Sequence, residues 1–340
     1  MKVQTGKRGK MKIITQINIC CKRLMGFSKN YNKRKSEIKR SFICLFIDWL
    51  LCLLFLGASA EDYFIYKFYE LSWYSRKQFV TEVKAMFLIR KFNHNGIQGR
   101  NIVEDKSKFD VVFKNYIKRN AVFSNDLTME QFEDFVKRNN QVIIKPINGF
   151  NGNGIFILNY MEGLERIKQV YDFLQDNECV IEEVLQQDGW LHELNPGTLN
   201  TMRINVINYN GEFEIQNAIL RSGQGFTVTD NICAGGVVAA IDLNTGMIIS
   251  KFCDLMNREV LEHPLTNTVI LGRVIPNWEE VKRVAVEAAK MIPDVIYSSW
   301  DIAVIKKGKI AIVEGNSYGN FNIQQIISKK GVLNQYKKYL

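Results

Sequence analysis

Two apolar segments near the C-terminus constrain the fold of this chain more than any other feature. Residues 300–305 and 310–314 are rich in Ile, Val and Ala, and the polar segment 306–309 with its glycine separates them. Short apolar runs on either side of such a turn predict a β-hairpin buried within a larger sheet. If the turn is centred on Lys307 and Gly308, residues whose numbers sum to about 615 lie opposite each other, because antiparallel pairing fixes that sum.

This register brings two carboxylates together. Asp301 comes to lie opposite Glu314, and Asn316 follows two residues later on the same face of the second strand. Like charges at this separation destabilise a sheet unless a cation holds them. Carboxylate and amide oxygens suit Mg²⁺, which completes its coordination with water and substrate phosphates. The three residues are therefore candidate ligands for Mg²⁺ or Mn²⁺. In the alternative interpretation both carboxylates are solvated at a sheet edge, which the apolar residues around them disfavour.

A glycine-rich loop earlier in the chain is a second candidate for anion binding. The strand predicted over 141–145 ends in Lys145, and the loop after it contains Gly149, Gly152 and Gly154. Glycines let backbone N–H groups approach an anion closely, and Lys145 adds a positive charge beside them. The spacing matches neither a Walker A motif nor a dinucleotide-binding fingerprint. Alone the loop is a weak signal, because loops of this composition more often form plain hairpins.

Between these two features the sequence alternates between strand and helix patterns. Thr128-x-x-Gln131 is a capping box at the start of one helix, and a second helix is expected to begin at Asn277. The inner face of that second helix is predicted at Trp278, Val281, Val284, Ala288 and Met291. Further strands are predicted over 155–158, 178–184, 202–208, 213–221 and 237–242, and further helices over 109–119 and 161–175. The pattern predicts an α/β (α+β) fold.

Positive charge is concentrated at the N-terminus. Residues 1–41 hold 13 Lys and Arg against one acid, Glu37, whereas the rest of the chain holds 32 bases against 34 acids. The net charge of +10 therefore describes a basic arm and not a basic protein. Such an arm is typical of a solvated tail, or of a segment that contacts anionic lipid or nucleic acid. Nucleic-acid binding is not expected as the main function, because the remainder lacks a basic stripe. Met11 and Met25 are alternative start sites.

Residues 42–60 form a strongly apolar stretch that a membrane segment could explain. The preceding Lys and Arg suit a cytoplasmic flank, and Ala58-Ser59-Ala60 resembles a signal-peptide cleavage site. However, Asp48 interrupts the run, and the part from 49 to 56 is shorter than the ~20 residues that a span needs. We therefore expect a buried helix of a soluble fold, with a membrane helix or a signal peptide as alternatives. Aromatic and basic residues over 61–92 recur at helical spacing, so the helical region should continue.

The cysteines and histidines disfavour two kinds of site. Seven cysteines occur without a C-x-x-C motif, and three histidines occur without metal-type spacing. This usage is typical of buried thiols in a reducing cytoplasm and not of a disulfide framework or a zinc site. We expect a cytoplasmic protein, with contact to the inner face of the membrane through the arm and residues 42–60 as a further interpretation.

Taken in chain order, these motifs resemble the ATP-grasp superfamily. The matching residues are Lys106, the segment Lys145-Pro-x-x-Gly-x-x-Gly-x-Gly154, Glu182, Glu183, Val184, Arg203, Asp301 and Glu314-Gly-Asn316. Within it the chain is similar to the sugar-transfer-associated group, which is related to α-L-glutamate ligases and found with polysaccharide biosynthesis genes. The segments that carry this similarity are 195–203, 220–223, 230–231, 235–236, 275–278 and 299–316. The resemblance implies an ATP-grasp fold of two α/β lobes that grip ATP, preceded by a helical N-terminal region.

The resemblance also implies roles for single residues. Lys106 and Lys145 would hold the α- and β-phosphates, and the loop with Gly149, Gly152 and Gly154 would cover them as a lid. Glu182, Glu183 and Val184 would line the adenine and ribose. Arg203 would stabilise the transferred γ-phosphoryl group, while Asp301, Glu314 and Asn316 would hold Mg²⁺. Candidates for the acceptor pocket are Arg221, Asp230, Asn231, Gly235 and Gly236. In simpler interpretations Lys106 is a surface lysine and Arg203 forms a salt bridge at the rim of the core.

The implied organisation has five parts: a basic, flexible arm (1–41), a helical region (42–100), a small lobe with the lid (101–185), a large lobe with the Mg²⁺ site (186–330) and a tail (331–340). The implied activity is ATP- and Mg²⁺-dependent ligation, in which a carboxylate is activated as an acyl phosphate and an amine or sugar-linked acceptor attacks it. Its setting would be capsular, exopolysaccharide or other sugar-polymer biosynthesis. The alternatives are an ATP-binding module that scaffolds glycosyltransferases at the membrane, and a kinase that phosphorylates an alcohol.

Overall fold

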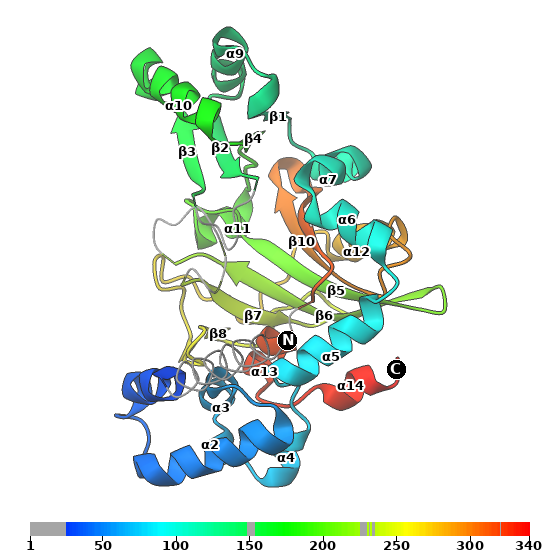
Figure 1. Cartoon of the computed structure of the whole chain (residues 1–340). Helices are drawn as coiled ribbons and strands as arrows, with labels where there is room; N and C mark the ends of the chain where they lie inside the picture. The colour runs from blue at the N-terminus through cyan, green and yellow to red at the C-terminus, as the bar shows by residue number, and fades with distance from the viewer. Residues whose placement is uncertain (1–24, 148–153, 225–229, 231, 233–234, 320) are drawn as a thin grey trace, which may run out of the picture. The chain divides into compact units, whose positions relative to one another are not determined.

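The computed structural model describes residues 25–147, 154–224, 230, 232, 235–319 and 321–340 (Figure 1). The chain divides into two compact units, the first formed by Met1–Arg90 with Ser328–Leu340 and the second by Lys91–Ile327. The predicted tail (331–340) thus belongs to the same unit as the N-terminal helices. The other predicted boundaries, including the one between lobes at residue 185, stay predictions.

The first unit is helical where the structure describes it. After a helix over 25–34, its elements are α2 (Phe42–Leu56), α3 (Ala60–Ile65), η1 (Phe68–Glu70), α4 (Trp73–Lys77), the start of α5 (Glu82–Asn93) and α14 (Leu333–Lys337). Helix α2 begins at the N-cap Ser41, whose hydroxyl accepts the N–H of Cys44, and ends at Gly57 in the left-handed conformation that glycine favours. Large aromatic side chains, among them Phe27, Trp49 and Tyr63, fill its core.

Helix α2 is buried on one face only, so the expectation of a fully buried helix is wrong. Leu45, Trp49, Cys52 and Leu56 are buried along one face, as predicted, but the opposite face is exposed. Among the residues that the structure describes, no helix is long and apolar enough to cross a membrane.

The second unit contains two antiparallel sheets. The smaller has the strand order β1-β4-β2-β3, formed by β1 (Ala121–Phe123), β2 (Gln141–Pro146), β3 (Phe156–Asn159) and β4 (Cys179–Glu183). Helices α9 (Met129–Asn139) and α10 (Leu164–Asp176) lie against it, and apolar residues of both, such as Phe132 and Ile167, share a core with Val142 and Ile181 of the strands (Figure 1). The predicted capping box at Thr128 and Gln131 is confirmed at the start of α9.

The larger sheet has seven strands in the order β11-β10-β5-β6-β7-β8-β9. They are β5 (Thr201–Tyr209), β6 (Glu212–Ser222), β7 (Val237–Ile241), β8 (Phe252–Cys253), β9 (Glu259–Val260), β10 (Tyr297–Ile305) and β11 (Lys309–Asn316). Helix α12 (Trp278–Lys290) packs on one face of this sheet, where Val281 and Ala288 join a core with Ile204, Leu220 and Ile302. The remaining helices are α6 (Ile97–Glu104), α7 (Lys106–Val112), α8 (Lys114–Ile117), α11 (Gly189–Leu194) and α13 (Phe321–Ser328).

Two details of α12 differ from the prediction. Asn277 precedes the helix, but its side chain donates to the carbonyl oxygen of Gly308 at 2.8 Å and caps no helical N–H group. Its backbone is left-handed, with φ of 53°, a conformation that Asn tolerates better than most residues. Met291, predicted on the inner face, follows the end of the helix and is exposed.

Candidate functional site

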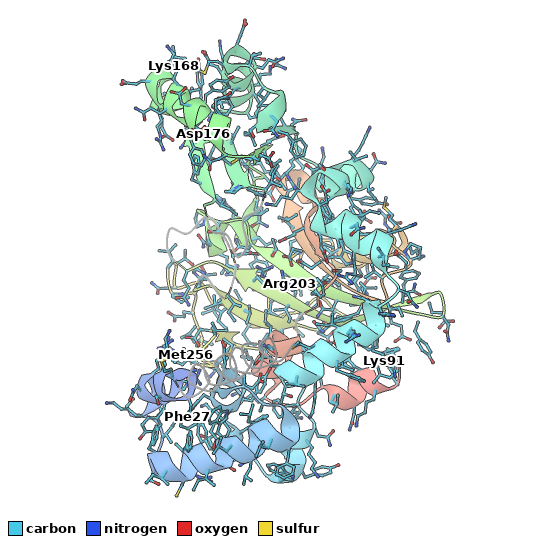
Figure 2. The ribbon with its side chains drawn as sticks, in the orientation of Figure 1. Phe27, Lys91, Lys168, Asp176, Arg203 and Met256 are labelled. Atoms are coloured by element: carbon cyan, nitrogen blue, oxygen red, sulfur yellow. The ribbon has the colours of Figure 1, made fainter. Side chains whose placement is uncertain are left out.

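The face of the large sheet opposite α12 carries a row of charged side chains on its central strands. Asp301 on β10 lies opposite Glu314 on β11, which confirms the predicted register of the hairpin. On its other side Asp301 lies opposite Arg203 on β5. Because side chains alternate along a strand, all three project from the same face, while the neighbouring Trp300 and Ile302 join the core under α12. Arg203 lies near the middle of this sheet (Figure 2). The hairpin pattern therefore predicted both strands and the opposition of Asp301 and Glu314.

Asp301 is the centre of an ion-pair cluster. Its two carboxylate oxygens accept from Nε and Nη2 of Arg203 at 2.7 and 2.6 Å, and Nη1 of Arg221 donates to it at 2.5 Å. Arg221 continues to Asp230 at 3.0 Å, and Asp230 accepts the hydroxyl of Thr201. Burial raises the pKa of Asp301, but the two guanidinium groups outweigh it and hold the pKa at about 2. Asp301 is thus ionised in any physiological condition.

The pKa of Glu314, directly opposite, is shifted in the other direction. Its carboxylate makes no hydrogen bond or ion pair with any residue that the structure describes. Desolvation and then the negative charge of Asp301 raise the pKa of Glu314 above its ordinary value, against the attraction of Arg203, Arg221 and Lys145. Glu314 is nevertheless exposed enough to reach a ligand. Of the two opposed carboxylates, it is the one whose ionised form needs a further cation.

These donors fit a divalent cation that prefers oxygen ligands. Glu314 contributes a carboxylate, and Asp301 keeps lone pairs that the arginines do not use, since a carboxylate accepts about four hydrogen bonds. Asn316 lies opposite Ser299, on the same face, and its buried Nδ2 has no hydrogen-bond partner in the described part of the chain. An amide in that position can turn its oxygen to a cation. Among the described residues, three clustered His, Cys, Asp or Glu side chains of the kind that hold a metal by themselves do not occur.

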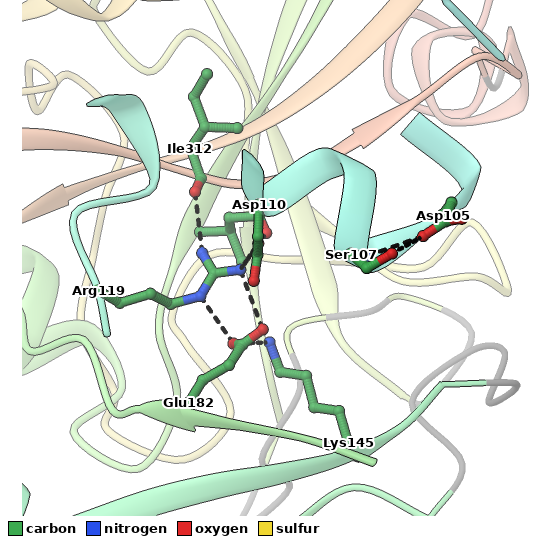
Figure 3. Close-up of polar contacts among 8 residues, drawn as sticks. Asp105, Ser107, Asp110, Arg119, Lys145, Glu182 and Ile312 are labelled. Atoms are coloured by element: carbon green, nitrogen blue, oxygen red, sulfur yellow. Dashed lines mark hydrogen bonds and ion pairs between the residues drawn. The ribbon is translucent and has the colours of Figure 1, made fainter. Parts of the chain in front are cut away.

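A second ion-pair cluster lies where the small sheet meets β11. The buried carboxylate of Glu182 on β4 lies 2.6 Å from Nζ of Lys145 on β2. It also lies 2.9 Å from Nε and 3.1 Å from Nη2 of Arg119, whose Nη1 donates to the carbonyl oxygen of Ile312 on β11 (Figure 3). Asp110 on α7 adds a longer contact of 3.8 Å to Arg119. Burial raises the pKa of Glu182, but Lys145 and Arg119 hold it at about 2.

Arg119 and Asp110 were not predicted as site residues. Nothing near them in the sequence marks them, because Arg119 follows an ordinary amphipathic helical pattern. Its partners Glu182 and Ile312 are 63 and 193 residues away. The only local signal is a charged residue at a helix end, which is more often solvated.

Lys106 and Lys145 lie near each other at the start of the glycine-rich loop, and their roles toward phosphate stay predictions. Nζ of Lys106 donates to the carbonyl oxygen of Pro146 at 2.6 Å, immediately after Lys145. Burial and the charge of Lys145 lower the pKa of Lys106. Lys106 is therefore not a free surface lysine. A cation whose pKa is lowered by burial and by a second cation gains from a nearby negative charge, so this position is suited to bind an anion.

The remaining predicted residues divide into described and undescribed ones. Gly154 has a φ of 77°, in the left-handed region that favours glycine, whereas Gly149, Gly152 and Asn231 lie outside the described residues. Glu183 is turned toward Asn120, whose backbone and side-chain N–H groups donate to it at 3.2 and 3.0 Å. Gly235, with a φ of 96°, and Gly236 precede β7. The structure thus brings Arg221 and Asp230 together but gives no role to the two glycines.

Most of the chain matches a known protein family. The model of the sugar-transfer associated ATP-grasp family matches residues 85–339, three quarters of the chain. The chain belongs to this family. Membership confirms the predicted resemblance and the ATP-grasp fold class, and with them ATP and Mg²⁺ as the cofactors of an ATP-grasp protein. It also supports the prediction of an enzyme of the ligase type. No curated protein sequence matches the chain.

Solved ATP-grasp structures resemble the chain at low identity. The ATP-grasp ligase PsnB, complexed with minimal precursor, Mg and ADP, is 16% identical over 81% of this chain and 70% of its own, with a TM-score of 0.45. The D-cycloserine synthetase DcsG is 11% identical over 76% and 78%, with a TM-score of 0.44. The D-alanine-D-alanine ligase from Coxiella burnetii is 9% identical over 71% and 60%, with a TM-score of 0.40. At these values the likeness carries no argument about substrate or mechanism.

Proposed function

We propose that this ATP-grasp protein is an ATP- and Mg²⁺-dependent ligase, which activates a carboxylate as an acyl phosphate for amide formation. The observation that carries the proposal is the opposed pair Asp301 and Glu314 on neighbouring strands, with two arginines on Asp301 and no direct cationic partner on Glu314 among the described residues. This arrangement suits a divalent cation on one side and phosphate oxygens on the other.

Four basic side chains are placed to offset phosphate charge. Lys106 and Lys145 flank the start of the glycine-rich loop, and Arg203 and Arg221 converge on Asp301. Asp301, Glu314 and Asn316 would hold Mg²⁺, whose positive charge supports phosphoryl transfer. The site therefore works by position and electrostatics, and no side-chain nucleophile is required.

Three of these cations are held by carboxylates in this structure, and we infer that two of them, Arg203 and Lys145, exchange partners during the reaction. Arg203 would move one N–H group from Asp301 to an oxygen of the transferred phosphoryl group, while Arg221 keeps Asp301 ionised. Lys145 would likewise move from Glu182 toward the nucleotide, while Arg119 keeps Glu182 ionised. In each cluster one cation is then mobile and the other one stays with the carboxylate.

The proposed chemistry has two balanced steps. An oxygen of the substrate carboxylate bonds to the γ-phosphorus as the bond from that phosphorus to ADP breaks. An amine nitrogen then bonds to the acyl carbon, inorganic phosphate leaves, and a proton from the nitrogen is released. Arg203 and the lysines stabilise the negative charge that moves between these oxygens.

We also propose that the reaction serves sugar-polymer biosynthesis, with glycosyltransferases as partners. The support is the family's description as associated with sugar transfer. Under this proposal Arg221, Asp230, Asn231, Gly235 and Gly236 adjoin the acceptor, and Glu182, Glu183 and Val184 adjoin the nucleotide base and ribose.

The test is ADP release from Mg–ATP in the presence of candidate carboxylates and amines, for the wild type and Glu314→Ala. We expect release that depends on both substrates and is abolished in the variant. ATP binding without such release would instead support an ATP-binding module. Release with an alcohol alone would indicate a kinase, and failure to bind Mg–ATP would contradict all three.

A further inference from the structure

The outward face of α2 is a continuous apolar surface in the first unit. Its exposed side chains include Ile43, Ile47, Leu51, Leu54 and Phe55, with exposed fractions between 43% and 75%. Successive members are four, four, three and one residues apart, so they lie along one side of the helix, opposite the buried residues Leu45, Trp49 and Cys52. We call these five residues the α2 outer face. A helix at a protein surface normally carries polar residues there, so this composition needs an explanation.

The single charged residue of α2 does not interrupt this face. Asp48 is turned inward, where its carboxylate oxygens accept from Nη1 of Arg76 and from the hydroxyl of Tyr63, each at 2.7 Å. Trp73 extends the apolar surface, because its ring lies 6.3 Å from that of Phe55 in an edge-on arrangement. The charge that argues from the sequence against membrane contact is thus neutralised inside the fold.

Positive charge adjoins the start of the α2 outer face. Lys29, Lys33, Lys35, Lys39 and Arg40 are exposed in the segment just before α2, and Glu37 is the single acid there. Bases at this position oppose the helix dipole, which favours acids in the first turn, and α2 has none there. They are therefore not explained as stabilisers of the helix. A negatively charged partner would explain them.

We propose that the first unit binds the surface of an anionic lipid bilayer through the α2 outer face. The five apolar side chains would enter the boundary between headgroups and acyl chains, and the neighbouring lysines and Arg40 would contact anionic headgroups. Trp73 would lie at the level of the headgroups, the position that Trp favours. Helix α2 has 15 residues, too few to span a bilayer, so it lies on the surface.

Charge favours the bilayer over a second copy of this chain as the partner. Pairing two α2 outer faces would bring together two copies of the described segment before α2, each with the five exposed bases named above and one acid. Such a contact is repulsive at physiological ionic strength, whereas a bilayer with anionic lipid attracts the same charges. The proposal is independent of the ATP site, since it involves residues of the first unit only.

Sedimentation with vesicles tests the proposal on the full chain. We expect binding to vesicles of phosphatidylcholine mixed with phosphatidylglycerol, weaker binding to phosphatidylcholine alone, and weakening by salt. The double variant Leu51→Glu/Leu54→Glu should lower the affinity at least about tenfold, because each leucine stabilises the bound state by its burial. The matched control Val111→Glu/Met161→Glu alters exposed apolar residues of the second unit and should bind as the wild type. Equal binding by the α2 variant and the wild type would overturn the proposal.

Cys44 reports directly on what covers this part of α2. It is exposed, and alkylation of its peptide can be followed by mass spectrometry. We expect rapid alkylation without vesicles and protection when anionic vesicles are added. Protection without vesicles, whether by residues 1–24 or by a second copy detected by light scattering, would show another occupant and contradict the proposal.

Discussion

The two ion-pair clusters of the second unit are built alike and differ in one respect. In each, a buried carboxylate holds two basic side chains, Glu182 with Lys145 and Arg119, and Asp301 with Arg203 and Arg221. In each, the basic partners hold the pKa of the carboxyl group at about 2. The second carboxylate of the Glu182 cluster, Asp110, contacts Arg119 at 3.8 Å, whereas that of the Asp301 cluster, Glu314, lies directly opposite Asp301 on the next strand.

That difference marks the Asp301 cluster as the one with a carboxylate available to a metal ion. The Glu182 cluster joins the small sheet to β11 through the bond from Arg119 to Ile312, and its charges are compensated by direct contact. The Asp301 cluster leaves Glu314 with a raised pKa, so the protein alone does not stabilise its ionised form. We therefore expect Glu182 to matter mainly for stability, Asp301 for both stability and activity, and Glu314 for activity alone.

Replacing Asp301 should have the largest effect. Asp301→Asn leaves the partly buried Arg203 and the buried Arg221 without their shared carboxylate, which should lower the free energy of unfolding by about 3–5 kcal/mol. It should also abolish ADP release, because a proposed metal ligand is lost. Urea unfolding and an ADP-release assay measure the two effects. Unchanged stability in Asp301→Asn would contradict the described ion pairs.

Replacing Glu182 should destabilise the protein but leave Mg²⁺ coordination intact. Glu182→Gln removes the charge that holds Lys145 and Arg119, so we expect a loss of about 3 kcal/mol in urea unfolding. Binding of Mn²⁺ in the presence of ATP should persist in this variant, in contrast to Asp301→Asn. Loss of metal binding in both variants would erase the distinction between the clusters.

The same substitution should alter the pH dependence of stability. The pKa of Glu182 is lowered from 4.5 to about 2 in the folded state, so the unfolded chain takes up the proton first as the pH falls. The stabilising contribution is therefore complete above about pH 4.5 and is lost toward pH 2. Between these values the free energy of unfolding should fall less steeply in Glu182→Gln than in the wild type. Parallel curves would indicate that Glu182 has an ordinary pKa.

A substitution in α9, which packs on the same small sheet as Glu182 but lies away from the ion pairs, should give a smaller loss of stability for comparison. Thr128→Ala removes the capping box of α9 and should cost about 1 kcal/mol. Because this side chain lies outside both clusters, the affinity for Mg–ATP should not change, as isothermal titration calorimetry can show. The control Thr128→Ser keeps the capping hydroxyl and should behave as the wild type. A changed affinity in Thr128→Ala would mean that any loss of stability in the small lobe disturbs the site.

Replacing Glu314 should have the smallest effect on stability. Glu314→Gln removes repulsion from Asp301 and breaks no described hydrogen bond, so the free energy of unfolding should rise slightly or stay within about 0.5 kcal/mol. Glu314→Asp, which keeps the charge, is the matched control and should not gain stability. A loss of several kcal/mol in Glu314→Gln would reveal a structural partner and weaken the assignment to a metal.

Much of this geometry could be predicted from the sequence, because strand pairing follows from local pattern. The turn at Lys307 and Gly308 fixed the register that places Asp301 opposite Glu314. The predicted strands 202–208 and 213–221 agree closely with β5 and β6, because their apolar residues alternate or run continuously as buried strands require.

What the sequence could not predict depends on contacts between distant elements. Arg203 was predicted to contact a phosphate, or alternatively to form a salt bridge, but its partner Asp301 could not be named, because the pair depends on β5 lying next to β10, 98 residues later. Asn277 has the usual preference of Asn for a helix N-cap, yet the nearby carbonyl of Gly308 takes its side chain instead. The outward face of α2 was missed for a similar reason, since hydrophobicity alone does not tell which side of a helix its neighbours cover.

The central claim is that Asp301 and Glu314 hold a divalent cation together with ATP. Electron paramagnetic resonance of Mn²⁺ tests it most directly, by measuring bound metal as ATP is added to the wild type and to Glu314→Gln. We expect ATP-dependent Mn²⁺ binding in the wild type and at least about a tenfold loss of affinity in the variant, at unchanged folding. Binding of Mn²⁺ and ATP by Glu314→Gln with the affinity of the wild type would contradict the claim.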